Sequence, residues 1–145
     1  MCIRDRDVPD TQSEEALLKI KEALADPELG PTTRITFGGF IFPDQCSAGA
    51  CASYHEKYDT WAFTKEIISG GEHVAIGGHA MVITGYDDNA VAIDNEGKKH
   101  QGLLILRNSW GEEAGDRGTY YMSYDYFKKL VIEAYKVVGV PESKV

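Results

Sequence analysis

The sequence predicts an α+β fold, in which one N-terminal helix is followed by a mostly antiparallel sheet. Residues 10–25 carry apolar side chains at a helical period. Later segments alternate between apolar and polar residues, or run continuously apolar over short stretches, which is typical of strands. With 145 residues, the chain has the length of a single domain and can bury a core.

The helix is expected over residues 10–25, where Thr11 and Glu14 stand at capping-box spacing. Asp26 and Pro27 should end it, because the residue before a proline avoids the helical region. The apolar stripe of this helix consists of Leu17, Leu18, Ile20 and Leu24.

The middle of the chain is less regular. Residues 33–37 alternate and predict a strand after a turn at Gly30-Pro31. Residues 38–53 are rich in Gly, Ala, Ser and Pro and predict a loop. Residues 54–69 are rich in aromatic and apolar side chains, but their spacing leaves a short helix and an irregular packed segment both open.

The C-terminal half predicts most of the sheet. Residues 79–86 and 102–107 are nearly continuous apolar runs, as expected for strands buried on both faces, with turn-forming residues between them. Residues 118–124 predict a third strand, residues 125–130 a short helical turn, and residues 131–140 a last strand.

Charge excludes several classes of partner. The chain has 15 Lys and Arg against 23 Asp and Glu, for a net charge of −8. Nucleic-acid binding and attachment to an anionic membrane both favour a basic patch, so neither partner is expected. No apolar run approaches the roughly 20 residues of a membrane helix. We expect a soluble protein, and the sequence leaves its compartment unknown.

The ends of the chain are expected to lie outside the folded unit. MCIRDR resembles a spurious leader of translated metagenomic assemblies, although it also reads as an ordinary polar N-terminus. We therefore expect residues 1–9 to be a non-native or disordered leader, residues 10–140 to form the domain, and residues 141–145 to be a tail.

Cysteine usage leaves several possibilities open. Cys2 lies in the suspected leader, and Cys46 and Cys51 lie close together in a segment of small residues. The latter two could form a disulfide, remain free thiols or supply half of a metal site.

Hairpin geometry brings two polar residues together. In an antiparallel pair, the start of the first strand lies beside the end of the second. His79 opens one predicted strand and Asn108 follows the next. An amide oxygen can accept the ring N–H and orient the imidazole, which leaves the other ring nitrogen free to exchange a proton with a nucleophile. A strand-end histidine beside a turn asparagine, without catalytic function, is the plainer alternative.

The surrounding motifs narrow this choice. GGHAMVITGYDD at 77–88 and LLILRNSWGEEAGDRGTYYMSY at 103–124 resemble the C-terminal half of the papain family. The resemblance implies that residues 10–140 form the right-hand, barrel-like domain of a papain-like fold. It also implies a cysteine-type peptidase acting on a peptide or protein, without a metal or another cofactor.

Individual site residues follow from the same resemblance. It implies that His79 is the general base and acid, that Asn108 holds the His79 ring, and that Trp110 shields their hydrogen bond from water. Residues expected to line the substrate cleft are Gly77, Gly78 and Ala80.

Two departures from the family pattern matter. Ala114 stands where the family often has tryptophan, which suggests looser packing. The nucleophilic cysteine of the family precedes the histidine by about 130 to 150 residues, a position before residue 1 of this chain. Neither Cys46 nor Cys51 has the surroundings of that cysteine. We therefore expect that the left-hand helical domain is absent from this chain. That N-terminal domain, which would carry the nucleophile, is the expected missing partner.

Two functions remain in view. The first is a fragment of a papain-like endopeptidase or aminopeptidase that is inactive alone. The second is a non-catalytic homologue that binds peptides or a partner protein. The remaining histidines, His55, His73 and His100, are expected at the surface, and no metal-binding pattern includes them.

Overall fold

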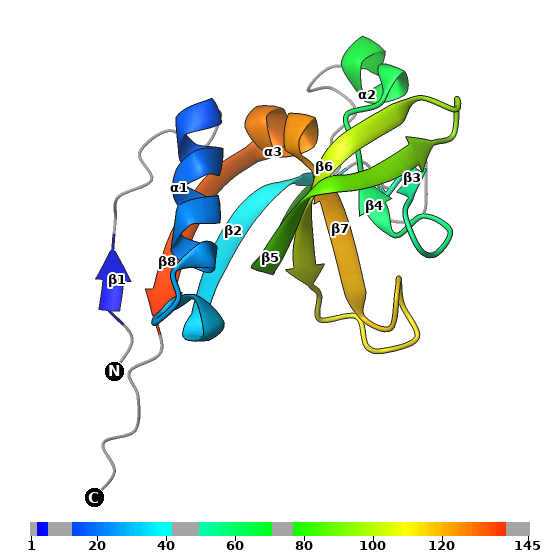
Figure 1. Cartoon of the computed structure of the whole chain (residues 1–145). Helices are drawn as coiled ribbons and strands as arrows, with labels where there is room; N and C mark the ends of the chain where they lie inside the picture. The colour runs from blue at the N-terminus through cyan, green and yellow to red at the C-terminus, as the bar shows by residue number, and fades with distance from the viewer. Residues whose placement is uncertain (1–2, 6–12, 42–49, 71–76, 139–145) are drawn as a thin grey trace, which may run out of the picture.

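The structure is a computed structural model that describes residues 3–5, 13–41, 50–70 and 77–138. These residues form three α-helices, one short 3-10 helix and a single sheet of eight strands (Figure 1). Within the described residues, every strand pairing except that of β4 with β7 is antiparallel. The predicted α+β class is confirmed.

Helix α1 (Glu14–Ala25) packs Leu17 and Ile20 of its apolar stripe into the core, whereas Leu18 of that stripe is 52% exposed. Its N-cap is Ser13, whose hydroxyl accepts from the Ala16 N–H at 3.1 Å, and not the predicted Thr11. The helix ends before Asp26, as predicted, because the backbone there turns away from helical geometry. A 3-10 turn η1 (Gly30–Thr32) leads into the sheet.

Three long strands form the part of the sheet under α1. Strand β2 (Thr33–Ile41) lies between β5 (Gly77–Asp94) and β8 (Val131–Val138). Strand β1 (Ile3–Asp5) pairs with β8 at the edge, so the expected leader over 1–9 includes three residues of strand. The sheet has an edge at β1, which pairs only with β8 among the described strands.

The other half of the sheet is built on a long hairpin. Strand β5 pairs with β6 (Lys99–Arg107), and β6 pairs with β7 (Thr119–Ser123). Helix α3 (Tyr124–Leu130) then returns the chain to β8. In Figure 1 this hairpin extends away from α1, toward α2 (Lys65–Gly70).

The segments that composition assigned to loops are partly strands. The loop prediction for 38–53 is wrong at 38–41, which continue β2, and at β3 (Ala52–Ser53). Residues 42–49 lie outside the described part. The undecided segment 54–69 contains β4 (Thr60–Trp61) and most of α2.

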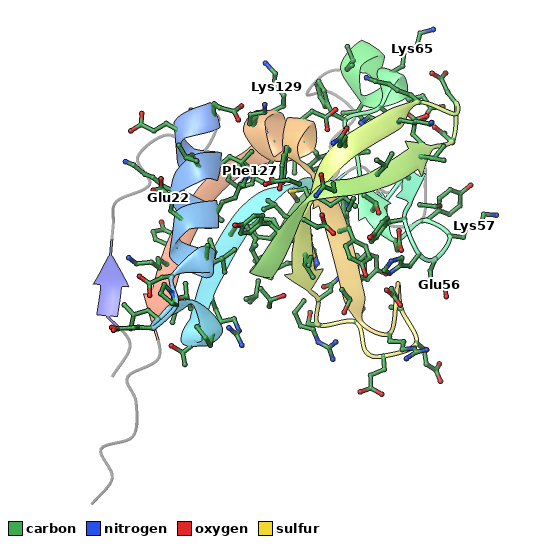
Figure 2. All side chains as sticks on the ribbon, viewed as in Figure 1. Glu22, Glu56, Lys57, Lys65, Phe127 and Lys129 are labelled. Atoms are coloured by element: carbon green, nitrogen blue, oxygen red, sulfur yellow. The ribbon has the colours of Figure 1, made fainter. Side chains whose placement is uncertain are left out.

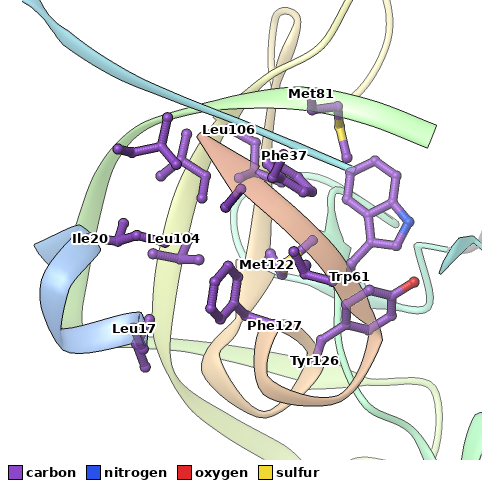
Figure 3. Close-up of a cluster of buried hydrophobic side chains, with 14 of the residues drawn as sticks. Leu17, Ile20, Phe37, Trp61, Met81, Leu104, Leu106, Met122, Tyr126 and Phe127 are labelled. Atoms are coloured by element: carbon purple, nitrogen blue, oxygen red, sulfur yellow. The ribbon is translucent and has the colours of Figure 1, made fainter. Parts of the chain in front are cut away.

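The main core, the larger of two clusters of buried apolar side chains among the described residues, lies between α1, α3 and the sheet (Figure 3). Phe127 of α3 points into this core, and charged side chains such as Glu22, Lys65 and Lys129 lie at the outside of the molecule (Figure 2). Trp61 is fully buried within the same cluster. The largest fully buried side chains of the core include Leu17, Ile20, Ile35, Ile83, Leu104, Leu106, Met122 and Tyr126.

Candidate active site

The β5–β6 hairpin brings His79 and Asn108 together. Val82 and Arg107 are Cα partners at this end of the ladder, so His79 precedes the paired region and Asn108 follows it immediately. His79 Nε2 lies 3.0 Å from Asn108 Oδ1. The approach of these two side chains, predicted from hairpin pairing, is confirmed, and the distance is an ordinary hydrogen-bond length.

This contact defines the orientation of the ring. An amide oxygen can only accept, so Nε2 of His79 is the donor in this hydrogen bond, and Nδ1 is the ring nitrogen that the bond leaves available. Asn108 Oδ1 also accepts from the Ser109 N–H at 2.8 Å, which fixes the direction of the amide. The Asn108 Nδ2 group is buried and has no hydrogen-bond partner in the described part of the chain.

The indole of Trp110 covers one face of the His79 ring. The two ring centroids are 4.8 Å apart and the planes are 24° from parallel. Trp110 itself is 39% exposed, so one face of the indole touches the imidazole while part of the ring meets solvent.

The loop is closely packed at Ala114 and Gly115, where looser packing was expected. Ala114 is half-buried against the main core cluster. The ring of Tyr120 lies so close to Gly115 that a Cβ atom there would meet it at 2.6 Å. Gly115 also has a φ of +63°, which favours glycine. The aromatic ring of Tyr120 therefore fills the space behind this loop.

A pocket of about 450 Å³ opens beside His79. Two of the three predicted cleft residues, Gly78 and Ala80, line it. Gly77 is exposed but does not line this pocket, and a Cβ atom added to it would meet nothing within 4 Å. The other lining residues are Gly38, Gly39, Ile132 and Glu133.

The sequence did not single out these four residues, because their place depends on distant pairing. Gly38 pairs with Glu133 and Gly39 pairs with Val131, so Ile132 is the extra residue of a β-bulge in β8. The bulge leaves Ile132 and Glu133 both exposed at the pocket. The bulge at residues 132–133 could be predicted only with the register of β2 against β8 known, so the sequence alone did not place these residues at the pocket.

No free thiol is available among the described residues. Cys51, the one cysteine they include, is fully buried and disulfide-bonded. The possibility of a free thiol at this position is therefore excluded. Cys2 and Cys46 lie outside the described residues.

The described residues contain no group of three or more His, Cys, Asp and Glu side chains that could hold a metal ion. In the same part of the chain, no helix has the length and apolarity needed to cross a membrane.

His100 is a correction to the expectation of a surface histidine. Its side chain is 1% exposed, with Nδ1 3.0 Å from Asp125 and Nε2 3.0 Å from Asp94. The hydrogen bond to Asp125 raises the pKa of His100, and the bond to Asp94 adds to this against the opposing effect of burial. Burial opposes ionisation of both carboxyls, but the hydrogen bonds outweigh it and lower the pKa of each.

His55 is exposed, as expected, and has its own carboxylate partner. Its Nδ1 lies 2.9 Å from Asp116, which also accepts from the Tyr121 hydroxyl at 2.7 Å. The Tyr121 hydrogen bond, followed by that of His55, lowers the pKa of Asp116. His73 lies outside the described residues.

Comparisons with known proteins agree with the sequence motifs. Residues 68–140, half of the chain, match the model of the Peptidase C1-like family. No curated protein sequence matches the chain.

Solved structures also resemble it. Xylellain, a cysteine protease from Xylella fastidiosa, is 18% identical with a TM-score of 0.42, and the match covers 74% of this chain and 32% of that one. The SERA5 proenzyme from Plasmodium falciparum is 17% identical with a TM-score of 0.47, covering 95% and 35%. PepW from Lactobacillus rhamnosis is 24% identical with a TM-score of 0.39, covering 72% and 22%.

The chain thus spans 22% to 35% of the length of these three structures. Its matched region contains the β5–β6 hairpin with His79, Asn108 and Trp110. The chain belongs to the Peptidase C1-like family, in agreement with the resemblance of its motifs to papain-like cysteine peptidases.

Proposed function

We propose that this chain is the part of a cysteine peptidase that supplies the proton-transferring histidine and its orienting asparagine. The observation that carries the proposal is the hydrogen bond between His79 Nε2 and Asn108 Oδ1, at 3.0 Å. It leaves Nδ1, on a half-buried ring at the edge of a pocket, as the nitrogen that a proton donor could reach. Trp110 lies on the same ring.

The chemistry requires a thiol from a segment outside this chain. That thiol would transfer its proton to His79 Nδ1, and the thiolate would attack the scissile carbonyl carbon. The imidazolium would then protonate the nitrogen of the leaving amine as the C–N bond breaks, leaving a thioester. His79 would next take a proton from water, whose oxygen attacks the thioester and releases the thiol and the carboxylic acid.

Asn108 would act by holding the ring through both proton transfers. The amide oxygen remains bonded to Nε2 whether Nδ1 is protonated or not, so the ring keeps one orientation. Trp110 would keep water from competing for that bond. A hydrogen bond in a site of lower dielectric is electrostatically stronger than one in water.

The pocket beside His79 would receive part of a peptide or protein substrate. Gly78 and Ala80 present backbone and small side chains there, so an extended chain could approach the sheet closely. Gly77 would belong to the continuation of the cleft outside this pocket. The partner that completes the cleft would be an N-terminal peptidase domain carrying the cysteine.

A second candidate is a non-catalytic peptide- or protein-binding module. The observation in its favour is that the described residues form a pocket at His79 but supply no free thiol. The two functions differ in what precedes the chain. A cysteine in the upstream coding sequence supports the peptidase, whereas serine or glycine at that position supports the binding module.

The test is to read the coding sequence upstream of this chain and to express both parts as one polypeptide. The proposal predicts hydrolysis of fluorogenic peptides by the joined polypeptide, loss of hydrolysis with His79→Ala, and none by the present chain alone. A joined polypeptide that folds, contains no cysteine at the upstream position and binds peptides without cleaving them would establish the binding module instead.

A further inference from the structure

Besides the ring of His79, two more aromatic rings contact the indole of Trp110. The Tyr120 ring meets the Trp110 ring edge to face, with centroids 5.7 Å apart and planes at 90°. The Trp61 ring lies 4.7 Å from Tyr120 and 6.2 Å from Trp110. Four rings therefore contact one another in series, from Trp61 to Tyr120, then to Trp110 and then to His79.

The exposed fractions of these rings indicate that the two buried rings support the exposed one. Trp61 is 0% exposed and Tyr120 is 6% exposed, whereas Trp110 is 39% exposed. Tyr120 lies on β7, where it pairs with Leu106 of β6, and Trp61 lies on β4, where it pairs with Met122. The two buried rings are thus fixed on strands of the sheet.

Trp110, by contrast, follows β6 in a loop. Gly111, next in the chain, has a φ of +91°. The ring contacts of the indole among the described residues are those with His79, Trp61 and Tyr120. An exposed indole on a loop needs such contacts to keep one orientation, because its side chain would otherwise sample several rotamers.

We propose that Tyr120 is a positioning residue for His79, acting through Trp110. The edge of its ring sets the tilt of the indole, and the indole in turn covers the hydrogen bond from His79 to Asn108. Edge-to-face contact is a favoured arrangement of aromatic rings, so the geometry is specific to an aromatic side chain at this position. Gly115, with no Cβ atom, lets the loop close over the Tyr120 ring.

This inference rests on the proposed function only for its catalytic consequence, since the ring geometry can be measured on the present chain. The measurement is NMR of the His79 ring in the full chain. Two quantities are recorded: the rate at which the Nε2 proton exchanges with water, and the ring-current shift of the His79 carbon-bound protons. Both report how the Trp110 indole lies on the imidazole.

The variants separate positioning from simple loss of packing. Tyr120→Leu keeps an apolar side chain in the core but removes the ring edge, and Tyr120→Phe keeps the ring. Met122→Ala is the matched control, because Met122 is buried on the same strand and in the same cluster. Trp110→Ala gives the response of an uncovered ring.

Tyr120→Leu should speed exchange roughly five- to tenfold and reduce the ring-current shift, while Tyr120→Phe and Met122→Ala stay within about twofold of the natural chain. Exchange in Tyr120→Leu no faster than in Met122→Ala would overturn the inference. In the joined polypeptide, Tyr120→Leu should lower kcat with little change in KM. A joined polypeptide inactive with every residue intact would count against the proposed function and leave the NMR result to decide the role of Tyr120.

Discussion

His79 and Asn108 are 29 positions apart in the chain and 3.0 Å apart in the structure, Nε2 to Oδ1. The hairpin that joins them is long, and the residues between form two strands and a turn. The contact therefore depends on the register of β5 against β6, because a slip of one residue would direct the His79 side chain to the other face of the sheet.

A larger side chain introduced into the pocket tests whether the pocket receives the substrate. Gly78→Val should lower kcat/KM of the joined polypeptide roughly tenfold, mainly by raising KM, because the new side chain occupies space meant for substrate. A Cβ atom at Gly78 has its nearest neighbour at 3.9 Å, so the fold should tolerate the change. Thr84→Val is the control, since Thr84 is exposed on the same strand and lies outside the pocket. Equal effects of the two substitutions would show that the pocket does not receive the substrate.

The cysteines of this chain should not act as nucleophiles. Cys51 is fully buried and disulfide-bonded, so it cannot supply the thiolate that such chemistry requires. The chain alone should neither cleave fluorogenic peptides nor take up an epoxide or vinyl-sulfone label at Cys46 or Cys51, as measured by mass spectrometry. Stoichiometric labelling of either cysteine, prevented by His79→Ala, would show that the chain carries its own nucleophile.

The prediction of the site from sequence succeeded where the contact is local. The two strands of the hairpin follow each other directly, so their pairing and the approach of His79 to Asn108 could be inferred from strand order alone. Residues 38–41 could not be recognised as strand, because Gly38 and Gly39 favour turns by composition. Pairing with both β5 and β8 overrides that preference.

The pocket and the buried histidine depend on contacts that no local pattern reports. Ile132 and Glu133 reach the pocket through a bulge against β2, which lies far away in sequence. His100 looked like a surface residue, because polar residues flank it in the chain. Its burial follows from two carboxylates, Asp94 at the end of β5 and Asp125 in α3, that only the folded chain brings together.

The cluster of His100, Asp94 and Asp125 should make stability depend on pH. The folded-state pKa of His100 lies above its ordinary value of 6.5, so its contribution is fully present below that pH and is lost as pH rises through the folded-state pKa. The carboxyl contributions are present above their ordinary value of 3.8 and are lost as pH falls through their lowered pKa values. The cluster is therefore most stabilising at mildly acidic pH.

Substitution of this histidine tests the prediction. At pH 6, His100→Gln should lower the free energy of unfolding by about 3 kcal/mol, because it leaves a buried carboxylate without its cationic partner. Denaturation curves at pH 6 and pH 9 should also show a smaller pH dependence in this variant. His55→Gln, at an exposed histidine, is the control. Persistence of the full pH dependence in His100→Gln would mean that other groups cause it.

Exposed apolar side chains around the site predict self-association of the isolated chain. Phe40, Trp110 and Ile132 are 36%, 39% and 53% exposed. Ile132 lines the pocket, Trp110 packs on the His79 ring, and Phe40 is the strand partner of Gly78, which lines the pocket. Apolar groups gathered at one place on a surface favour association. Sedimentation should show association of the isolated chain, and Ile132→Lys should reduce it. Ile93→Lys, at a similarly exposed position near the tip of the β5–β6 hairpin, should have less effect. A monomer at high concentration would contradict this expectation.

The central claim is that His79, oriented by Asn108, transfers protons in peptide hydrolysis. Its most direct measurement is kcat/KM of the joined polypeptide with His79→Ala, Asn108→Ala and His55→Ala. His55 is the matched comparison, because it is the other described histidine near the surface that has a hydrogen-bonded side-chain partner. We predict a loss of about a thousandfold or more for His79→Ala, a smaller loss for Asn108→Ala, and activity within about twofold for His55→Ala. Activity that survives His79→Ala, or that is lost equally with His55→Ala, would contradict the account.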